Sequence, residues 1–238
     1  GRIEFHAKST SIRIPFESVN GELSIISKSA TGERVLNLTK SVRIEKGANL
    51  GEKGKIKIES SSGAPARLGG EFTGKGIIEV NKTEVEIAQD VRVRGPNLVF
   101  DEVRSLVFQG GEKRFLKFES LDRTEWLLGE VALTFTGPGR LINSSAGIDI
   151  LGDSHLGTRI QLEGMEFIND GEFVLGSSRR GDTTLSLAKT SMINSDLLVL
   201  GEGSSIFKFS LSDDSSIETA EASEIRLRTT AVNHFFGP

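Results

Sequence analysis

LINSSAGIDILG at residues 141–152 is the first of three related stretches, followed by FINDGEFVLG at 167–176 and MINSDLLVLG at 192–201. Their shared asparagines, Asn143, Asn169 and Asn194, recur after 26 and then 25 residues. A fixed period of about 25 residues is typical of stacked, near-identical supersecondary units. The sequence therefore predicts a repetitive architecture in place of one ordinary globular core.

A second alternating stretch lies between one unit and the next: TRIQL at 158–162, TLSL at 184–187 and FKFSL at 207–211. Alternation of apolar and polar residues with a period of two, bounded by Gly, Ser, Asn and Asp, is typical of strands and their turns. We expect an all-β fold, a single-stranded right-handed parallel β-helix of about nine coils of roughly 25 residues each.

Equivalent apolar residues should stack inside this coil as ladders. Three ladders are expected: Ile160, Leu185 and Phe209; Leu162, Leu187 and Leu211; and Ile142, Ile168, Ile193 and Ile217. The closing Leu-Gly pairs, at 151–152, 175–176 and 200–201, should share a further position. We expect Asn143, Asn169 and Asn194 at turns, where each side chain bonds nearby backbone or the asparagine of the next coil.

We expect one domain over residues 1–238, because short strands run through nearly the whole chain. Residues 131–230 are the regular repeat region, and residues 1–50 are expected to be an N-terminal cap or less regular coils. The stretches 60–70 and 177–183 should leave the rod as loops. Such interruptions of the repeat are where a binding function is expected.

The composition limits the classes of partner. The net charge is −4, from 29 basic and 33 acidic residues that are well mixed along the chain, which argues against nucleic acid. The chain has no Cys, so disulfides and thiolate chemistry are excluded. No apolar run is long enough to span a membrane, and residues 1–6 lack a signal-peptide core. We expect no membrane insertion of this segment, and any targeting segment to be absent from it.

Units of this form, each followed by an alternating strand, resemble the right-handed parallel β-helices of bacterial surface exoproteins. These are the filamentous-haemagglutinin-like and autotransporter passenger domains, and the resemblance covers residues 131–230. It implies a non-catalytic adhesin or exoprotein module, secreted or at the cell surface, that binds a host-cell protein or a surface glycan. The secretion-domain signature of the haemagglutinin family is not recognisable, which leaves the secretion route open.

Two other functions stay open. One is a phage tailspike-like receptor-binding protein, with or without polysaccharide-cleaving activity. The other is a purely structural spacer. A passenger domain would be monomeric and a tailspike-like protein trimeric, so the sequence leaves the oligomeric state undecided. No cofactor is expected.

The sharpest binding hypothesis is the tripeptide Arg180-Gly181-Asp182, in a polar turn between two strands. An exposed Arg-Gly-Asp can present a cation and a carboxylate to an integrin. The carboxylate then completes the coordination of a metal site on the receptor. A given tripeptide of common residues occurs by chance in roughly a few per cent of chains of this length, so a Gly turn flanked by solvated charges is the alternative interpretation.

Catalytic signals are weak. Gly152-Asp153-Ser154-His155 is similar to the nucleophile block of the SGNH/GDSL hydrolases, but the Asp-x-x-His that would supply the base is missing before His234. A glycan-cleaving groove would need paired carboxylates, for which Asp149, Asp170 and Asp196 are the nearest candidates. With one Trp and no Tyr, the chain lacks the stacking surfaces of most sugar grooves. The three His have no ligand spacing, so no metal site is expected.

Overall fold

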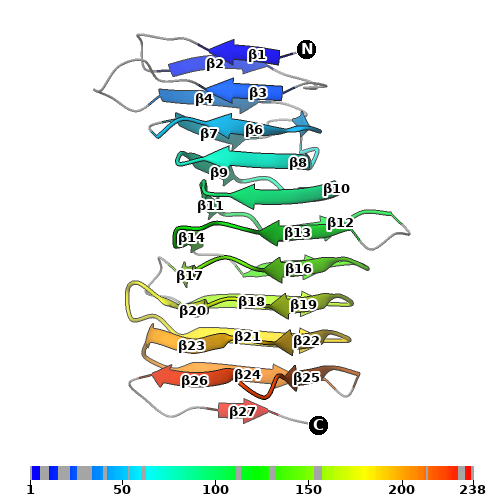
Figure 1. Cartoon of the computed structure of the whole chain (residues 1–238), viewed down its shortest axis with the longest axis vertical. Coiled ribbons are helices and arrows are strands. Elements are labelled where there is room, and N and C mark those ends of the chain that lie inside the picture. Colours follow the sequence, from blue (N-terminus) through cyan, green and yellow to red (C-terminus); the bar gives the residue numbers. More distant parts are fainter. Residues whose placement is uncertain are drawn as a thin grey trace.

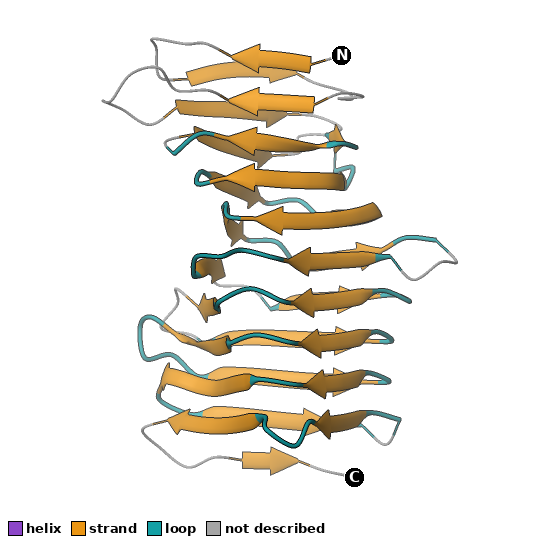
Figure 2. Ribbon diagram, in the orientation of Figure 1, coloured by secondary structure: helices purple, strands orange, loops and turns teal. Residues whose placement is uncertain are grey.

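The computed structural model describes residues 2–5, 11–15, 22–25, 34–39, 42–52, 54–59, 63–110, 114–128, 132–152, 157–212, 214–229 and 234–236. Within these ranges every regular element is a strand and none is a helix, and the helix colour does not occur in Figure 2. No helix there could serve as a membrane span. The prediction of an all-β chain is confirmed.

The strands stack as a parallel β-solenoid, an elongated rod with the N-terminus at one end and the C-terminus at the other (Figure 1). They belong to two sheets, one of 17 strands and one of 10. Most strands pair in parallel with the strand one coil earlier and the strand one coil later, as Leu185 does with Ile160 and with Phe209. This is the parallel β-helix that the repeat predicts.

The larger sheet divides into two faces along the rod. Strand β10 (Val85–Arg94) has a register shift between Ile87 and Val91. Its first part pairs with β12 and its second part with β13, so both faces continue from this one strand. Strand β8 (Ala66–Gly74) spans both faces in the same way, because it pairs with β5 and with β6.

We call the three sides of the rod face 1, face 2 and face 3. Face 1 holds, besides the first parts of β8 and β10, β5 (Arg43–Ile44), β12 (Ser105–Phe108), β15 (Leu133–Thr136), β18 (Thr158–Glu163), β21 (Thr183–Ala188), β24 (Phe207–Leu211) and β27 (His234–Phe236). Face 2 holds β1 (Arg2–Phe5), β3 (Glu22–Ile25), β6 (Gly47–Leu50), β13 (Phe115–Phe118), β16 (Arg140–Asn143), β19 (Glu166–Asn169), β22 (Ser191–Asn194) and β25 (Ser216–Thr219).

Face 3 is the ten-stranded sheet, to which each coil gives one strand. Its strands are β2 (Ser11–Pro15), β4 (Arg34–Thr39), β7 (Gly54–Glu59), β9 (Ile77–Asn81), β11 (Asn97–Asp101), β14 (Thr124–Leu128), β17 (Ile148–Gly152), β20 (Phe173–Ser177), β23 (Leu197–Ser204) and β26 (Glu224–Thr229). Described strands within residues 1–50 belong to the same sheets as the rest of the rod.

The core is a set of apolar ladders along the axis. On face 1, Ile160, Leu185 and Phe209 form one ladder and Leu162, Leu187 and Leu211 another, as the sequence predicts. Trp126 fills the middle of the rod, with ring centroids 4.5 Å from Phe118 and 5.5 Å from Phe100. Alternate side chains of a strand point to opposite sides, so each ladder of inward-facing residues has a ladder of outward-facing residues beside it.

The predicted third ladder is wrong in its placement. Ile142, Ile168 and Ile193 pair with one another, but on the outer side of face 2, where each is only partly buried. Ile217 does not continue this series, since Ile193 pairs with Glu218 and Ile217 pairs with Met192 on the inner side. A displacement of one residue moves a side chain to the opposite side of the sheet.

The three Leu-Gly pairs do not share one position either, because the first pair is displaced by one residue from the other two. Leu151 pairs with Gly176 and lies outside, whereas Leu175 pairs with Ile150 and Leu200 inside the rod. The loop expected at 60–70 is also wrong in part, because residues 66–70 begin strand β8. Ala66 and Leu68 are buried there, and their alternation with Arg67 makes this segment a strand.

Candidate functional site

The three repeated asparagines form a hydrogen-bonded ladder inside the rod, at the ends of face 2 strands. Asn143, Asn169 and Asn194 are 1%, 0% and 0% exposed. The side-chain amide of Asn143 donates to Oδ1 of Asn169 at 2.7 Å, and that of Asn169 donates to Oδ1 of Asn194 at 2.7 Å. Buried amides linked in this way have no access to a ligand.

The ladder also fixes the turn from face 2 to face 3. Nδ2 of Asn143 donates to the carbonyl of Glu172 at 3.0 Å, and Nδ2 of Asn169 donates to the carbonyl of Leu197 at 3.2 Å. These carbonyls lie at the start of the next face 3 strand. The asparagines therefore join successive corners, which is a structural role.

The tripeptide at 180–182 lies at the corner between β20 and β21, next to face 3. Arg180 is exposed and has a positive φ of 58°. Gly181 is buried, donating its N–H to Oγ of Ser177 at 2.9 Å. The Asp182 carboxylate is 3.7 Å from Nζ of Lys208, and its side chain is 42% exposed. Both charged side chains are thus accessible, while the N–H of the glycine between them is hydrogen-bonded within the corner.

The three aspartates considered for glycan cleavage do not form a described pair. Asp149 lies on the outer side of β17, and both its oxygens accept hydrogen bonds of 2.5 Å from Arg123. Asp170 and Asp196 are exposed in the turns of two later coils. The Asp149 carboxylate is thus bonded to Arg123 through both of its oxygens.

The remaining catalytic and metal candidates gain no support from geometry. Gly152 ends β17 and is buried, while Asp153, Ser154 and His155 lie outside the described residues. Of the three His, His234 alone is described, in β27. The described part of the chain holds no group of three or more His, Cys, Asp or Glu that could bind a metal.

A depression on the outer side of face 3 was not predicted from the sequence. Its volume is about 390 Å³. Its floor is apolar: Leu151, Val174, Leu197 and Val199. Although they lie on the outer side, Val174 and Val199 are only 4% and 2% exposed, which places them beneath longer neighbouring side chains.

Charged side chains form the rim of this depression. Arg123 binds Asp149 and lies 3.1 Å from Oε2 of Glu172, and Arg228 lies 3.3 Å from Oε2 of Glu202. Hydrogen bonding to Asp149 raises the pKa of Arg123, with smaller contributions from Glu172. The site therefore combines an apolar floor with a balanced rim of fixed cations and anions. Such a surface suits an amphipathic ligand.

The sequence signal for this site is the register of face 3. When Ile150 is aligned with Leu175 and Leu200, Val174 and Val199 fall one above the other on the outer side. Two stacked valines at outward positions are unusual, since outward positions are mostly polar in a sheet with one wet side. Aligning the Leu-Gly pairs hides this feature, because it places Leu151 inside.

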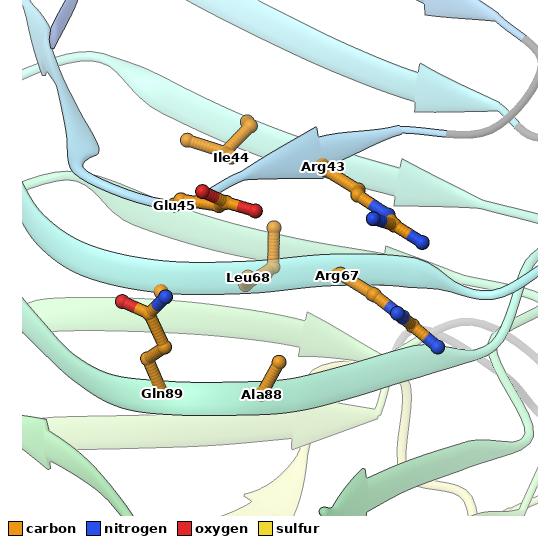
Figure 3. Close-up of a pocket in the computed structure, with 8 residues that line it drawn as sticks. Arg43, Ile44, Glu45, Arg67, Leu68, Ala88 and Gln89 are labelled. Carbon is orange, nitrogen blue, oxygen red and sulfur yellow. The ribbon is translucent and has the colours of Figure 1, made fainter. Parts of the chain in front are cut away.

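A second hollow lies at the corner between faces 1 and 2 in the upstream half. Figure 3 shows Arg43 and Arg67 side by side at its edge, with Glu45 and Gln89 at the other side. Nε of Arg67 is 2.5 Å from Oε2 of Glu86, so this arginine is already paired. A volume of about 70 Å³ holds a few waters at most, since one water occupies about 30 Å³ of liquid.

No protein-family model, curated protein sequence or solved structure matches this chain. What is established is therefore the fold, a parallel β-solenoid built from a repeat. A proposal for the function of the chain has to come from the surface features of the rod.

Proposed function

We propose that this chain is a non-catalytic binding module, in which the solenoid is a rigid support and the depression on face 3 receives the ligand. The observation that carries this proposal is the depression itself, in which the partly exposed Leu151 and Leu197 lie inside a rim of charged side chains. An apolar patch with convergent polar groups, built on strands, is the usual form of a binding site.

Three described carboxylates are poor candidates for the acid of a glycosidase. A glycosidase acid needs a raised pKa, so that it is protonated when it meets its substrate. The pKa values of Glu79, Glu119 and Glu224 are instead lowered. At Glu79, burial alone would raise the pKa, and hydrogen bonds from Lys55 and Lys57 outweigh that effect.

The finer proposal is an adhesin or exoprotein module, secreted or at a cell surface, that binds a surface glycan or a host-cell protein. Its support is the resemblance of the 25-residue units to bacterial passenger domains, together with an elongated rod that presents its faces to solvent (Figure 1). In this proposal Arg180 and Asp182 form a second contact, at the corner that follows β20.

The test compares binding of fluorescently labelled wild-type protein and two variants to a fixed panel. The panel contains lipopolysaccharide, capsular polysaccharides, mammalian glycans and cultured epithelial cells. Leu197→Lys places a charge on the floor of the depression, and Ile168→Lys makes the same change at a similarly part-buried position on the outer side of face 2. We expect wild type and Ile168→Lys to bind and Leu197→Lys to lose binding at least about tenfold.

Circular dichroism and thermal melting show whether each variant keeps its fold. If a folded Leu197→Lys protein binds as wild type does, the ligand lies elsewhere on the rod. If wild type binds no member of the panel, the module is a spacer and the proposal fails.

A further inference from the structure

Three isoleucines form an apolar stripe on the outer side of face 2. Ile142 pairs with Ile168, and Ile168 pairs with Ile193, so the three side chains lie one above another in successive coils. Each of them is only partly buried. Outward positions of a sheet with one wet side are mostly polar, and a contiguous apolar patch on such a side points to a contact surface.

Charged and polar residues surround the stripe in a definite order. Two residues before the first two isoleucines lie Arg140 and Glu166, which pair with each other in adjacent coils. Two residues after the same isoleucines, at the ends of the strands, lie the exposed Ser144 and Asp170. One coil upstream, the column of the isoleucines continues with Lys117. A partner for this surface must therefore bring an apolar stripe together with complementary charges.

A second copy of face 2 meets both requirements in one arrangement. A two-fold axis that runs parallel to the strands, midway between β16 and β19, sets the two rods antiparallel. Ile142 then faces Ile168 of the second copy, and Arg140 faces Glu166 of the second copy. Because of the symmetry each contact occurs twice, and such charge complementarity fixes the register of an interface.

Other two-fold arrangements of the same face are disfavoured by charge. An axis along the rod sets Glu166 against Asp170 of the second copy, twice. An axis parallel to the strands but passing through β19 sets each of these two carboxylates against its own copy. Like charges juxtaposed across an interface oppose association. The charges of face 2 therefore select antiparallel rods with their centre between β16 and β19.

We propose that two copies of this chain associate through face 2 as this antiparallel dimer. The aliphatic stem of Lys117 then covers Ile193 of the second copy, while its ammonium stays 2.7 Å from Oε1 of Glu119 in its own chain. A two-fold dimer closes on itself, so the association stops at two copies. The depression lies on face 3, outside this contact, so the dimer does not depend on the proposed ligand site.

The first experiment is the mass in solution, by light scattering and sedimentation over a range of concentrations. We expect a dimer for wild type. Arg140→Glu should raise the dissociation constant by about tenfold or more, because it sets two acidic pairs at the centre of the contact. The exchanged variant Arg140→Glu/Glu166→Arg should restore the dimer, since each contact again joins opposite charges.

Substitutions of isoleucine by lysine separate the stripe from the general effect of an added charge. Ile142→Lys places a cation on the stripe and should give a monomer. Ile77→Lys makes the same change at a partly buried outer position of face 3, in β9, and should leave the dimer intact. Ile168→Lys should also be monomeric and should keep the ligand binding of the depression, so failure of one proposal is told from failure of the other.

The second experiment reports the geometry and does not depend on those variants. The chain has no Cys, so a nitroxide attached to one introduced thiol gives a single distance to the second copy by electron paramagnetic resonance. Asn49→Cys lies in β6, four coils before β16, so its labels should be about nine strand spacings, or about 43 Å, apart along the rod. Asp196→Cys follows β22, one coil after β19, so its labels should be about three spacings, or about 14 Å, apart along the rod.

Parallel rods would instead bring the labels close together at both positions, and that result would overturn the proposal. A monomer at every concentration, a trimer or larger assembly, or a dimer that Ile142→Lys leaves intact would each overturn it as well.

Discussion

Asn143 and Asn169 are joined by a single buried hydrogen bond of 2.7 Å, from the side-chain amide of one coil to that of the next. The same position in earlier coils is occupied by Phe118 and Val93 and in the last coil by Thr219. The rod thus changes from an apolar to an amide ladder where the regular repeat begins. An amide ladder needs the same residue in every coil, which explains why the repeat is visible in the sequence there.

The middle of the ladder should be its most sensitive position. Asn169→Ala removes the acceptor of Asn143 and the donor to Asn194, and leaves a small cavity. We expect a loss of about 2–4 kcal/mol in the free energy of unfolding, measured by urea denaturation. Asn49→Ala, at an exposed face 2 position, should cost less than about 1 kcal/mol. Equal losses at both positions would contradict the structural role of the ladder.

Trp126 should stabilise the rod through its size and not through its indole N–H. The side chain is 1% exposed, and Nε1 is among the buried atoms without a hydrogen-bond partner in the described structure. Trp126→Ala should cost about 3–5 kcal/mol, while Trp126→Phe should cost less than half as much, because no hydrogen bond is lost. Thermal melts of the two variants give the comparison; a Phe variant as unstable as the Ala variant would point to a bond at Nε1.

Glu119 should make stability depend on pH in the acid range. A hydrogen bond from Lys117 lowers the pKa of Glu119 against the opposing effect of burial, and Arg94 adds to the lowering. A group whose pKa is lower folded than unfolded stabilises the protein above the unfolded value, near 4.3, and loses that effect as pH falls through the folded value.

The measurement is urea denaturation of wild type and Glu119→Gln at pH 7 and at pH 3. Wild type should be the more stable at pH 7, and the difference should be smaller at pH 3, which lies below the pKa of the carboxyl in the unfolded chain. Glu84→Gln, at an exposed position, controls for the change of side chain itself. A difference that stays constant with pH would show that the ion pairs of Glu119 contribute nothing.

The Arg180-Gly181-Asp182 corner remains a prediction that a cell-binding assay decides. Asp182→Glu moves the carboxylate by one methylene and should abolish adhesion to integrin-bearing cells if this tripeptide is the ligand. Lys208→Met removes the cation 3.7 Å from Asp182 and leaves the tripeptide intact, so adhesion should persist. Unchanged adhesion of the Asp182→Glu protein would dispose of the integrin hypothesis.

The period and the core of the regular region follow from the sequence because both depend on local alternation. Ile160 and Leu185 are found in register from spacing alone, and the structure confirms this pairing. The side on which a residue lies is harder to predict, because it changes with every one-residue displacement. Aligning Leu151 with Leu175 in place of Gly176 put an outer residue inside, and so concealed the floor of the depression on face 3.

The rest of the site could not be predicted for a related reason. The rim joins Arg123, Asp149 and Glu172, which come from three different coils and share no motif. Their approach depends on coil lengths that vary along the rod: Ile77 and Asn97 pair across 20 residues, whereas Leu98 and Trp126 pair across 28. A strict period of 25 residues does not bring such residues together.

Binding without cleavage is tested most directly by chemistry on the glycans that the protein binds. Wild-type protein is incubated with each bound polysaccharide of the panel, and newly formed reducing ends and unsaturated sugars are measured over time. We predict none above the level of a heat-denatured sample, even where binding is saturated. New ends that increase with protein concentration would contradict the proposal and identify the rod as a glycan-cleaving enzyme.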